Sequence, residues 1–536
     1  MSDMNRETQQ QIDHLARQEA QAAMNRVRIE ATGLVNYQSR GRLAIIGNQQ
    51  ALEIAPRLSD KLHPMVILTE GAEEPGVPVV PVGGRPIAIE GYLGAFKIMV
   101  GQEGRSNFEI IAVDLILDLS SEPLMDQDMP PPGYFRSSLD ETELDQAIEN
   151  MGGMTGRFEK PRYFDYDPQI CAHGRSGKTA CTRCLDVCPA QAITSLAETI
   201  EVNAYLCQGG GACATVCPSG AIRYVYPGVK DTLERLRKLF TVYRESGGER
   251  PVLLIRASSD TPIAAPEAGN HLVMEVEELA SVGLEVWLSA LAYGAQAVWL
   301  VDENDLTKDV AEALHQQLST AEELICAMGY PVGVIKLGSI EAFKDSAFMP
   351  DLKPAGFSGL GDKRQTAYLA IDHLFAQAQR AKPMATLSQG APFGEAVVSS
   401  QSCTLCLSCV GACPGKALQS GSGEHPELLF VEANCLQCGL CTRTCPEDAI
   451  WITPRLIFDS EARNRPRTLH EEQPFHCVSC GKPFATRSVI EKMRSKLSGH
   501  YMFQSERALR RLSLCDECRV VDIAQDPEAL DGQVRQ

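Results

Sequence analysis

The sequence has no long apolar run and no recognisable export signal. No stretch of 18 consecutive apolar residues occurs, which predicts that the chain has no transmembrane helix. The N-terminal segment MSDMNRETQQQIDHLARQEAQ is polar and predicted to be helical. It lacks both the apolar centre of a signal peptide and a twin-arginine start. We therefore expect a soluble, cytoplasmic protein with no membrane span of its own.

Motifs of the common enzyme classes are also missing. The turn after the first expected strand reads GNQQA at 47–51 instead of G-x-G-x-x-G, which argues against a dinucleotide site there. We find no P-loop, flavin fingerprint, catalytic triad or radical-SAM CxxxCxxC loop. The sequence therefore predicts no catalytic residue.

Basic residues are outnumbered by acidic ones. The chain has 50 Lys and Arg against 69 Asp and Glu, and a formal net charge of −19. Nucleic-acid binding requires basic stripes, so this balance argues against a nucleic-acid partner. An acidic surface suits docking onto a basic patch of a redox protein, although it also serves solubility alone.

No cysteines are left for a disulfide framework. Of the 20 cysteines, 19 fall in three metal-binding motifs. The remaining one, Cys326 in AEELICAMGY, is expected to pack as a small apolar residue on a helix. Cysteines used in this way indicate a reducing compartment.

The second half of the chain contains a complete two-cluster bacterial ferredoxin pattern. The run C-x2-C-x2-C-x3-C-P occurs at 403–414 and again at 435–446. Three cysteines of a run bind one [4Fe–4S] cluster, and the fourth, just before proline, reaches the other cluster. Because each run gives its fourth cysteine to the other cluster, two ligand sets are predicted. Group C is Cys403, Cys406, Cys409 and Cys445, and group D is Cys413, Cys435, Cys438 and Cys441.

A second cysteine pair lies earlier in the chain and departs from the pattern at its start. Lys178 stands where the first cysteine is expected, and the nearest candidate is Cys171, because the loop AHGRSGKTA has been inserted. Loop-closure cost grows slowly with length, so Cys171 can still reach the cluster. His173 could replace a cysteine ligand or lie close to the cluster; the other interpretation is a solvated loop residue. Group A is therefore Cys171, Cys181, Cys184 and Cys217.

The other half of this pair lacks one cysteine. Gly210 in CQGGGAC occupies the second ligand position, which leaves group B with Cys188, Cys207 and Cys213. Three thiolates suit a [3Fe–4S] cluster, or an incomplete [4Fe–4S] cluster whose unique iron binds water, hydroxide or substrate; an empty site is the third reading. We expect three [4Fe–4S] clusters plus this fourth site. All four units continue alike, as CPAQAI, CPSGAI, CPGKAL and CPEDAI, which indicates an internal repeat.

Two CxxC knuckles form a third motif near the C-terminus. Their four thiolates predict a closed tetrahedral site for zinc, with rubredoxin-like iron as the alternative. The segment between them is basic and predicted to be helical, with Val489, Met493 and Leu497 as a core stripe. We call these four cysteines the knuckle site: Cys477, Cys480, Cys515 and Cys518.

The sequence between the motifs predicts two α/β blocks. Expected strands are 42–47, 65–69, 78–82 and 109–119 in the first block, and 251–256, 284–288, 295–302 and 331–337 in the second. The fold class is multidomain α/β, with two bacterial-type 2[4Fe–4S] ferredoxin modules of α+β type and a small zinc-ribbon-like module. The expected order is an N-terminal helix (1–30), an α/β domain (31–150), ferredoxin-like module 1 (160–225), an α/β domain (226–345), a linker with one helix (346–395), ferredoxin-like module 2 (396–455) and the CxxC…CxxC module (470–525).

The motifs CTRCLDVCPAQAI, YRESGGERPVLL and CVSCGKPF…LCDECR resemble those of the long bacterial polyferredoxin-type 4Fe–4S dicluster proteins. The resemblance covers most of the chain. It implies electron transfer or maturation alongside a molybdenum-dependent formate dehydrogenase. The family pattern has a cysteine where this chain has Gly210.

Two function classes follow. The leading one is an iron–sulfur protein that relays single electrons between soluble redox partners and has no substrate chemistry of its own. The alternative is an oxidoreductase subunit or enzyme, in which an α/β block holds a flavin or group B binds substrate, or a maturation factor for such an oxidoreductase. A flavin absorption band would favour the alternative.

Overall fold

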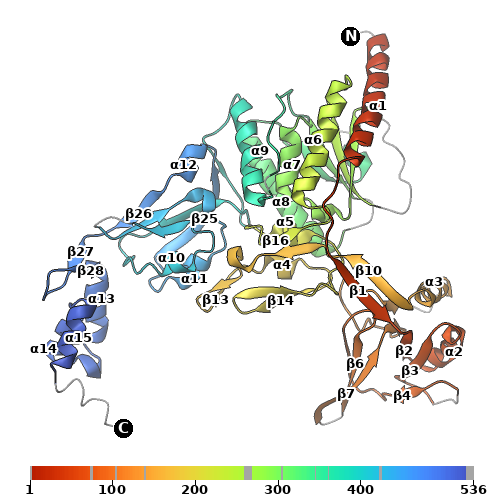
Figure 1. Cartoon of the computed structure of the whole chain (residues 1–536), viewed down its shortest axis with the longest axis horizontal. Helices are drawn as coiled ribbons and strands as arrows, with labels where there is room; N and C mark the ends of the chain where they lie inside the picture. The colour runs from red at the N-terminus through yellow and green to blue at the C-terminus, as the bar shows by residue number, and fades with distance from the viewer. Residues whose placement is uncertain are drawn as a thin grey trace.

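The computed structural model describes residues 3–72, 76–102, 105–137, 141–258, 268–302, 306–343, 346–359, 361–421 and 425–526. Figure 1 shows an α/β unit from the first part of the chain at the lower right and a larger helical body at the centre. The ferredoxin modules lie below and beside that body, and the C-terminal elements lie at the far left. The cysteine motifs therefore run across the middle of the molecule and out to one end.

A parallel sheet forms the centre of the first α/β unit. Its order is β4-β3-β2-β8-β9. Helices α2 and α3 cover one face, and the antiparallel sheet β5-β6-β7 covers the other. The bounds are β2 Arg42–Gly47, α2 Gln49–Leu58, β3 His63–Leu68, β4 Val79–Pro81, β5 Ile87–Glu90, β6 Phe96–Gln102, β7 Arg105–Val113, β8 Leu115–Asp118, β9 Tyr134–Arg136 and α3 Glu141–Gly152.

Local contacts explain the structure of two segments of this unit, the expected strand 109–119 and the GNQQA turn. The run 109–119, expected as one strand, is divided between β7 and β8, which belong to different sheets. The break is at Asp114, whose buried carboxylate accepts hydrogen bonds from the Arg42 guanidinium and from the backbone N–H of Arg40 and Arg42. In the GNQQA turn, the Asn48 side chain caps α2 by accepting from the backbone N–H of Gln50.

The second α/β unit has a parallel sheet of order β18-β17-β19-β20. The segment 284–288, expected as a strand, lies instead in α7, in which every residue is buried. A helix that is apolar on all sides has no sequence period that distinguishes it from a buried strand. The strand β18 was not predicted. The bounds are α6 Val229–Glu245, β17 Val252–Ala257, β18 His271–Val276, η2 Leu279–Ser281, α7 Leu284–Ala292, β19 Ala297–Val301, α8 Lys308–Ala327, β20 Ile335–Gly338 and η3 Ile340–Phe343.

Two helices from outside the expected boundaries complete this unit. Helix α1 (Asp3–Asn25) packs against α6, and α9 (Lys363–Gln377) packs against α7. Ala20 of α1 and Ile371 of α9 are fully buried in the same core. The segment 346–395 is therefore more than a linker. Cys326, expected to be packed, is exposed on α8, which corrects that expectation.

The ferredoxin modules consist of short elements. The insertion in module 1 forms the hairpin β12–β13. Module 1 contains β1 Leu34–Ser39 paired with β10 Gly156–Pro161 beside it, β11 Phe164–Tyr166, η1 Pro168–Ile170, β12 Gly174–Arg175, β13 Lys178–Thr179, α4 Arg183–Asp186, β14 Ile193–Leu196, β15 Thr199–Val202, α5 Ala212–Val216 and β16 Ile222–Tyr224. Module 2 contains β21 Met384–Thr386, β22 Gly394–Val398, α10 Ser408–Ala412, β23 Leu418–Ser420, β24 Glu427–Phe430, η4 Glu432–Asn434, α11 Leu440–Thr444, β25 Ile450–Ile457, α12 Ser460–Asn464 and β26 Arg467–Glu471.

The C-terminal module packs a short hairpin against helices. In the expected apolar stripe, Val489, Met493 and Leu497 are only half-buried, and the buried residue of this helix is Ile490. The bounds are β27 Pro474–His476, β28 Pro483–Thr486, α13 Arg487–Leu497, η5 Tyr501–Phe503, α14 Glu506–Arg511 and α15 Asp516–Ala524.

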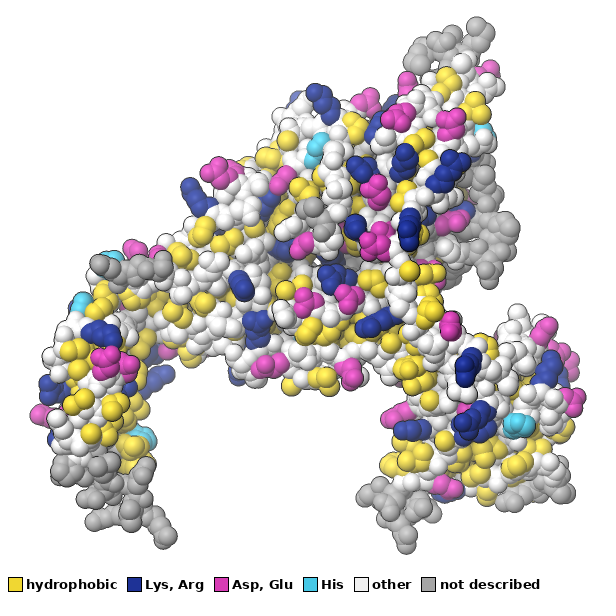
Figure 2. All heavy atoms as spheres, in the orientation of Figure 1, with side chains coloured by type: hydrophobic (Ala, Val, Ile, Leu, Met, Phe, Trp, Pro, Cys, Tyr) yellow, Lys and Arg dark blue, Asp and Glu magenta, His cyan; other side chains and the backbone are white. Residues whose placement is uncertain are grey.

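Within the described ranges, no helix is both long and apolar enough to cross a bilayer. On the face shown in Figure 2, basic and acidic side chains of the described residues are interspersed over the central body. The net negative charge is therefore not gathered into one patch on this face.

Candidate iron–sulfur and metal centres

Two cavities in module 2 are each lined by one of the predicted cysteine groups. All four cysteines of group C line one cavity, together with Val398 and Leu428. All four of group D line the other, together with Phe430 and Ile452. In each cavity, the fourth sulfur comes from the opposite run, as the crossed-over pattern predicts. Cys406 of group C is exposed, whereas Cys435 and Cys441 of group D are buried.

Left-handed backbone shapes the cysteine loops. In the loop of group C, Leu405 and Leu407, on either side of Cys406, have φ of 52° and 59°. In the loop of group D, Gln437 and Gly439, on either side of Cys438, have φ of 51° and 77°. A non-glycine residue in this region costs roughly 1–2 kcal/mol, so the geometry must be fixed by the surrounding fold. The two loops therefore share the same conformation, with left-handed residues on both sides of the second cysteine.

The residues after each Cys-Pro pair share a second feature. The third residue after the cysteine has positive φ in all four units: Gln191, Gly220, Lys416 and Asp448. Two of these turns also donate a backbone N–H to the cysteine sulfur, from Ala192 to Cys188 at 3.4 Å and from Ala449 to Cys445 at 3.3 Å. Such N–H···S bonds stabilise a negatively charged cluster.

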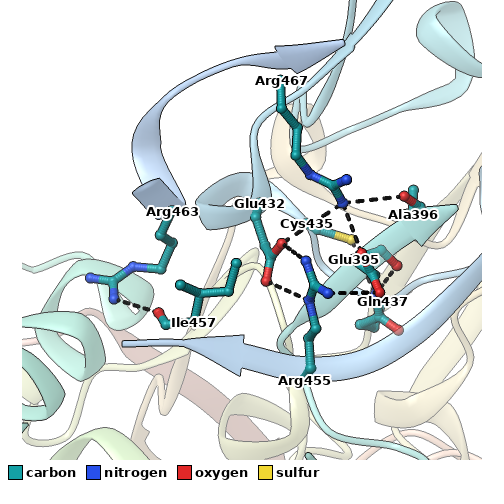
Figure 3. Close-up of polar contacts among 9 residues, drawn as sticks. All are labelled: Glu395, Ala396, Glu432, Cys435, Gln437, Arg455, Ile457, Arg463 and Arg467. Atoms are coloured by element: carbon teal, nitrogen blue, oxygen red, sulfur yellow. Dashed lines mark hydrogen bonds and ion pairs between the residues drawn. The ribbon is translucent and has the colours of Figure 1, made fainter. Parts of the chain in front are cut away.

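A polar network surrounds the group D cysteine Cys435 (Figure 3). The Gln437 amide donates to the Cys435 sulfur at 3.3 Å and to the Glu395 carbonyl at 3.1 Å. Arg455 bridges two acids, with N···O distances of 2.7 Å to Glu432 and 2.9 Å to Glu395. The bridge holds β22, η4 and β25 together beside the cluster loop.

Burial and crowding raise the pKa of several thiols in module 2. The pKa of Cys409 is raised to about 12, first by burial and then by the other three cysteines of group C. Burial is likewise the main cause that raises the pKa of Cys438 to about 12, with contributions from Cys413 and Cys435. Ionising such groups together is unfavourable unless a cation offsets their charge, and iron supplies that compensation.

Group A comes together although its first cysteine lies outside the standard spacing. The pKa of Cys184 is raised first by burial and then by Cys217, Cys181 and Cys171, so all four lie within electrostatic range. Backbone hydrogen bonds of the inserted hairpin bring this about, because the N–H of Cys181 donates to the carbonyl of Ala172. The hairpin closes the longer loop.

His173 is neither a ligand candidate nor a solvated loop residue. It is 2% exposed, and both ring nitrogens have partners: Nδ1 lies 2.7 Å from the Cys181 carbonyl oxygen, and Nε2 lies 2.7 Å from Ser195 Oγ. The first contact requires Nδ1 to donate. His173 therefore ties the hairpin to β14 and lies beside Cys181 of group A; the interpretation as a solvated loop residue was wrong.

Group B is buried and keeps the loop conformation of a cluster site. The pKa of Cys213 is raised well above its ordinary value, first by burial and then by Cys207 and Cys188. Gly209 and Gly211 have φ of 85° and 76°, the same pattern that flanks Cys406 and Cys438. Gly210 itself is not in this region.

The three glycines of this loop, Gly209, Gly210 and Gly211, differ in whether a side chain would fit at their positions. A Cβ on Gly209 would lie 2.8 Å from the Tyr163 ring, and one on Gly211 would lie 2.4 Å from the Ser281 Cα. A Cβ on Gly210 would have ordinary contacts, at 3.6 Å from Pro189 Cγ and 3.7 Å from the sulfur of Met129. Nothing in the backbone requires glycine at 210. The proximity of Met129 had no signal in the sequence, because it comes from a distant loop.

The two ferredoxin modules meet at groups A and D. Cys181 of group A contributes to the raised pKa of Cys438 in group D. The Arg443 guanidinium of α11 donates to the Thr179 carbonyl of β13 at 2.7 Å. The insertion that displaces Cys171 thus also forms the contact with the other module.

Helix α9 begins with two basic residues that hold both modules. The Lys363 ammonium donates to the carbonyls of Ala214 at 2.8 Å and of Cys217 in group A at 3.1 Å. The Arg364 guanidinium donates to the carbonyl of Cys435 in group D at 2.6 Å. Sequence reasoning placed this helix in a linker and gave it no role.

The four sulfurs of the knuckle site lie close enough together to hold one metal ion. They all lie within 4.8 Å of one another, and those of Cys480 and Cys515 are 3.7 Å apart. The pKa of Cys477 is lowered to about 6: burial acts to raise it, but the backbone N–H groups of Cys480, Cys515 and Ser479 outweigh burial. Metal–sulfur bonds of about 2.3 Å fit this spacing.

The C-terminal module is attached to the end of module 2 that holds group C. The hydroxyl of Thr486 donates to the Thr404 carbonyl, inside the group C loop, at 2.9 Å. Lys492 of α13 pairs with Glu447, which lines the group C cavity. The C-terminal module therefore packs beside group C.

A larger cavity of about 490 Å³ lies between module 1, the starts of α7 and α8, and α9. Cys217 of group A is in its wall. The Glu285 carboxylate is 2% exposed, and its Oε2 has no hydrogen-bond partner among the described residues. Asp309 and Glu312 also line the cavity.

Comparisons with known proteins agree with the cysteine geometry. Residues 385–450, which contain groups C and D, match the 4Fe-4S dicluster domain, and residues 178–226 match the LdpA Fe-S cluster-binding domain. Hydrogenase-4 component A from Escherichia coli (strain K12) is 42% identical over 55 residues, which are 10% of this chain and 24% of that protein.

Among solved structures, a chain of the formate dehydrogenase–heterodisulfide reductase–formylmethanofuran dehydrogenase complex from Methanospirillum hungatei matches at 16% identity and a TM-score of 0.19. The match covers 60% of this chain and 89% of that one. The matched families and the paired cysteine cavities lead to one conclusion: the chain is a mixed α/β protein that carries ferredoxin-type 4Fe–4S domains.

Proposed function

We propose that the protein relays single electrons through clusters in the order C, D, A and B. The observation that carries this proposal is the contact between the modules at groups D and A, where the Arg443 guanidinium of α11 donates to the Thr179 carbonyl, two residues before Cys181, at 2.7 Å. Within each module, the crossed-over pattern makes neighbours of C and D and of A and B. One contact between modules therefore joins two short relays into a longer one.

The ligand assignment behind this proposal is that of the sequence. Groups A, C and D each hold a [4Fe–4S] cluster, group B holds a fourth cluster with three cysteines, and the knuckle site holds zinc. Support for zinc comes from the four-thiolate set and the tight spacing of its sulfurs. In this assignment the zinc stabilises the end of module 2 and does not carry electrons.

Helix α9 and the Arg443 contact fix the junction between the two modules. Electron transfer slows steeply with distance, so the separation of groups D and A must be held constant. Lys363 and Arg364 bind carbonyls of cysteines in groups A and D from adjacent positions on one helix. Because α9 is packed in the core of the second α/β unit, this core acts as the rigid frame of the relay.

The partners in this proposal are redox proteins of an oxidoreductase system. The 55-residue similarity to a hydrogenase component supports such a system, and the motif resemblance points to a molybdenum-dependent formate dehydrogenase. Exposed Cys406 brings group C within reach of a partner surface. A cytoplasmic location fits the number of free thiols required as ligands.

The junction can be tested in the anaerobically purified full chain. Complete reduction should add one electron per [4Fe–4S] cluster, and neighbouring reduced clusters should give broadened paramagnetic spectra through magnetic coupling. The double variant Arg443→Ala and Lys363→Ala should weaken the coupling between modules and slow reoxidation of the far module by a protein acceptor. Arg223→Ala is the matched control, because Arg223 is an exposed arginine of module 1 that pairs with Asp165.

Two outcomes would contradict the relay. Clusters that load fully but cannot be reduced and reoxidised reversibly would exclude electron transfer. Unchanged coupling and reoxidation rates in the double variant would exclude the D-to-A junction as the path.

The cavity beside Cys217 supports a second candidate, an oxidoreductase that acts on a small molecule. It lies where α7 and α8 begin, beyond the carboxyl ends of β18 and β19, which is the usual ligand position of parallel α/β sheets. Its acids Glu285, Asp309 and Glu312 disfavour a phosphate-bearing flavin or nucleotide, because Glu285 Oε2 is buried without a partner among the described residues. A flavin band in the purified protein would contradict that argument, and stabilisation by a small amine would support the cavity as a binding site.

A further inference from the structure

The loop between β8 and β9 is bound to the group B site from two sides. The backbone N–H of Met129 donates to the Pro189 carbonyl at 3.0 Å. The Gln208 side-chain amide donates to the Met129 carbonyl at 3.0 Å. Pro189 and Gln208 directly follow two of the three group B cysteines. Met129 is therefore held by the same loops that would hold the cluster.

The loop that carries Met129 is itself fixed at its base. Asp118, at the end of β8, is fully buried and accepts a hydrogen bond from the Tyr134 hydroxyl at 2.5 Å. The same carboxylate accepts from the backbone N–H groups of Ser120 and Leu124, both at 2.9 Å. These bonds join the two ends of the loop through one side chain, so its path toward group B is defined by the sheet.

The sulfur of Met129 lies close to the position from which the missing ligand side chain would extend. Gly210 has the same left-handed neighbours as Cys406 and Cys438, so a side chain at 210 would leave the loop as theirs do. Met129 Sδ is 3.7 Å from the Cβ position of Gly210. A thioether is a soft ligand that suits iron–sulfur clusters, and methionine has three torsions with which to adjust.

We propose that Met129 provides the fourth sulfur ligand of group B, so that this site holds a [4Fe–4S] cluster with three thiolates and one thioether. The proposal rests on the relay function, because it assumes a loaded cluster at group B. A thioether is neutral, so the cluster carries one negative charge less than its all-cysteine neighbours. It should therefore have the highest reduction potential of the four and accept the electron at the end of the relay.

Replacement of Met129 by leucine tests the ligand, because leucine keeps the apolar volume and removes the sulfur. The wild-type protein, oxidised and anaerobic, should lack the paramagnetic signal near g of about 2.01 that a three-iron cluster gives. Met129→Leu should produce that signal and lose about one iron per chain. Adding Gly210→Cys to Met129→Leu should restore the iron and remove the signal, because the loop then supplies a thiolate.

Met125→Leu is the control. Met125 lies in the same loop, but its side chain packs in the core between the two sheets of the first α/β unit, so iron content and spectra should not change.

Should Met129→Leu fold poorly, Met129→Cys provides a second test: iron should be retained and the reduction potential of this cluster should fall. A near-stoichiometric three-iron signal in the wild type, or unchanged iron and spectra in Met129→Leu, would overturn the proposal. Reversible reduction of groups A, C and D in the same samples reports on the relay itself, so the two failures can be distinguished.

Discussion

Single residues in this protein set the conformation and charge of the cluster loops. Leu405, Leu407 and Gln437, which lie in the cysteine loops, adopt left-handed backbone that normally favours glycine. Their strain is compensated when the loop binds a cluster with several sulfur–iron bonds. The loops are therefore expected to be least ordered before cluster assembly, and apo protein should be digested there first.

Gln437 offers a test of how one side chain tunes a cluster. Its amide donates to the Cys435 sulfur from a buried position, and such bonds stabilise the reduced, more negative cluster. Gln437→Leu should lower the reduction potential of group D by on the order of tens of millivolts. Potentiometric titration followed by paramagnetic spectra measures this. Gln419→Leu, at a glutamine that bonds only to the exposed Lys416 carbonyl, should leave every potential unchanged.

Asp114 predicts a pH dependence of folding in the first α/β unit. Its pKa is lowered: burial acts to raise it, but hydrogen bonds from the Arg42 side chain and from the backbone of Arg42 and Arg40 outweigh burial. The ionised form thus stabilises the fold above the unfolded pKa of about 3.9, and this contribution is lost as pH falls through the lower folded pKa.

Asp114→Asn should lower the free energy of unfolding at neutral pH by about 1–3 kcal/mol. The difference between the variant and the wild type should shrink in acid. Thermal melts at neutral pH and near pH 3 measure both effects. A constant difference at both pH values would contradict the role of the Asp114 charge.

The roles of residues that belong to a spaced motif could be predicted from the sequence. The roles of residues that depend on contacts between distant segments could not. The cysteines of groups C and D could be assigned from spacing, because three ligands of each cluster lie in one run and the crossed-over pattern supplies the fourth. His173 was misread because its partners, the Cys181 carbonyl and Ser195, are defined only when the hairpin closes. Met129 had no sequence signal, since the loop that carries it belongs to another unit.

At the scale of elements, the insertion in module 1 and helix α9 have the largest consequences. The hairpin β12–β13 closes the loop between Cys171 and Cys181 of group A and also contacts α11 of module 2. Expected strands with flanking turns were mostly found, because short β-branched runs between polar turns are distinctive. The prediction of a strand at 284–288 was wrong because α7 is buried on all sides, so its apolar residues show no helical period and do not reveal the length of the element.

The C-terminal module yields a prediction about stability. A structural tetrahedral site adds folding free energy directly, so Cys477→Ser should lower the melting temperature and expose 470–525 to protease. The visible spectrum of the iron–sulfur clusters should not change. Loss of a chromophore in this variant would mean that the knuckle site holds iron, and the zinc assignment would then be wrong. Cys326→Ser is the control, because that exposed cysteine belongs to no predicted site.

At the scale of the whole molecule, the modules form a line that the sequence order does not reveal. In the chain, module 1 comes before module 2 and 185 or more residues separate their cysteines, with the second α/β unit between them. In the fold, α9 brings groups A and D together, and the C-terminal module lies beyond group C (Figure 1). Sequence patterns could predict each module because the contacts within it are local. The order of clusters depends on contacts between modules, for which spacing gives no information.

The metal content of the whole chain distinguishes the assignments. Four complete [4Fe–4S] clusters give about 16 iron atoms per chain, and three with one [3Fe–4S] cluster give about 15. We expect about 16 iron and one zinc after anaerobic purification, because Met129 is placed to retain the corner iron of group B. Elemental analysis against quantitative amino-acid analysis measures both metals, and acid-labile sulfide should match the iron. A value near 15 would favour the three-iron cluster, and fewer than about eight would mean that module 1 is empty and that the relay stops at group D.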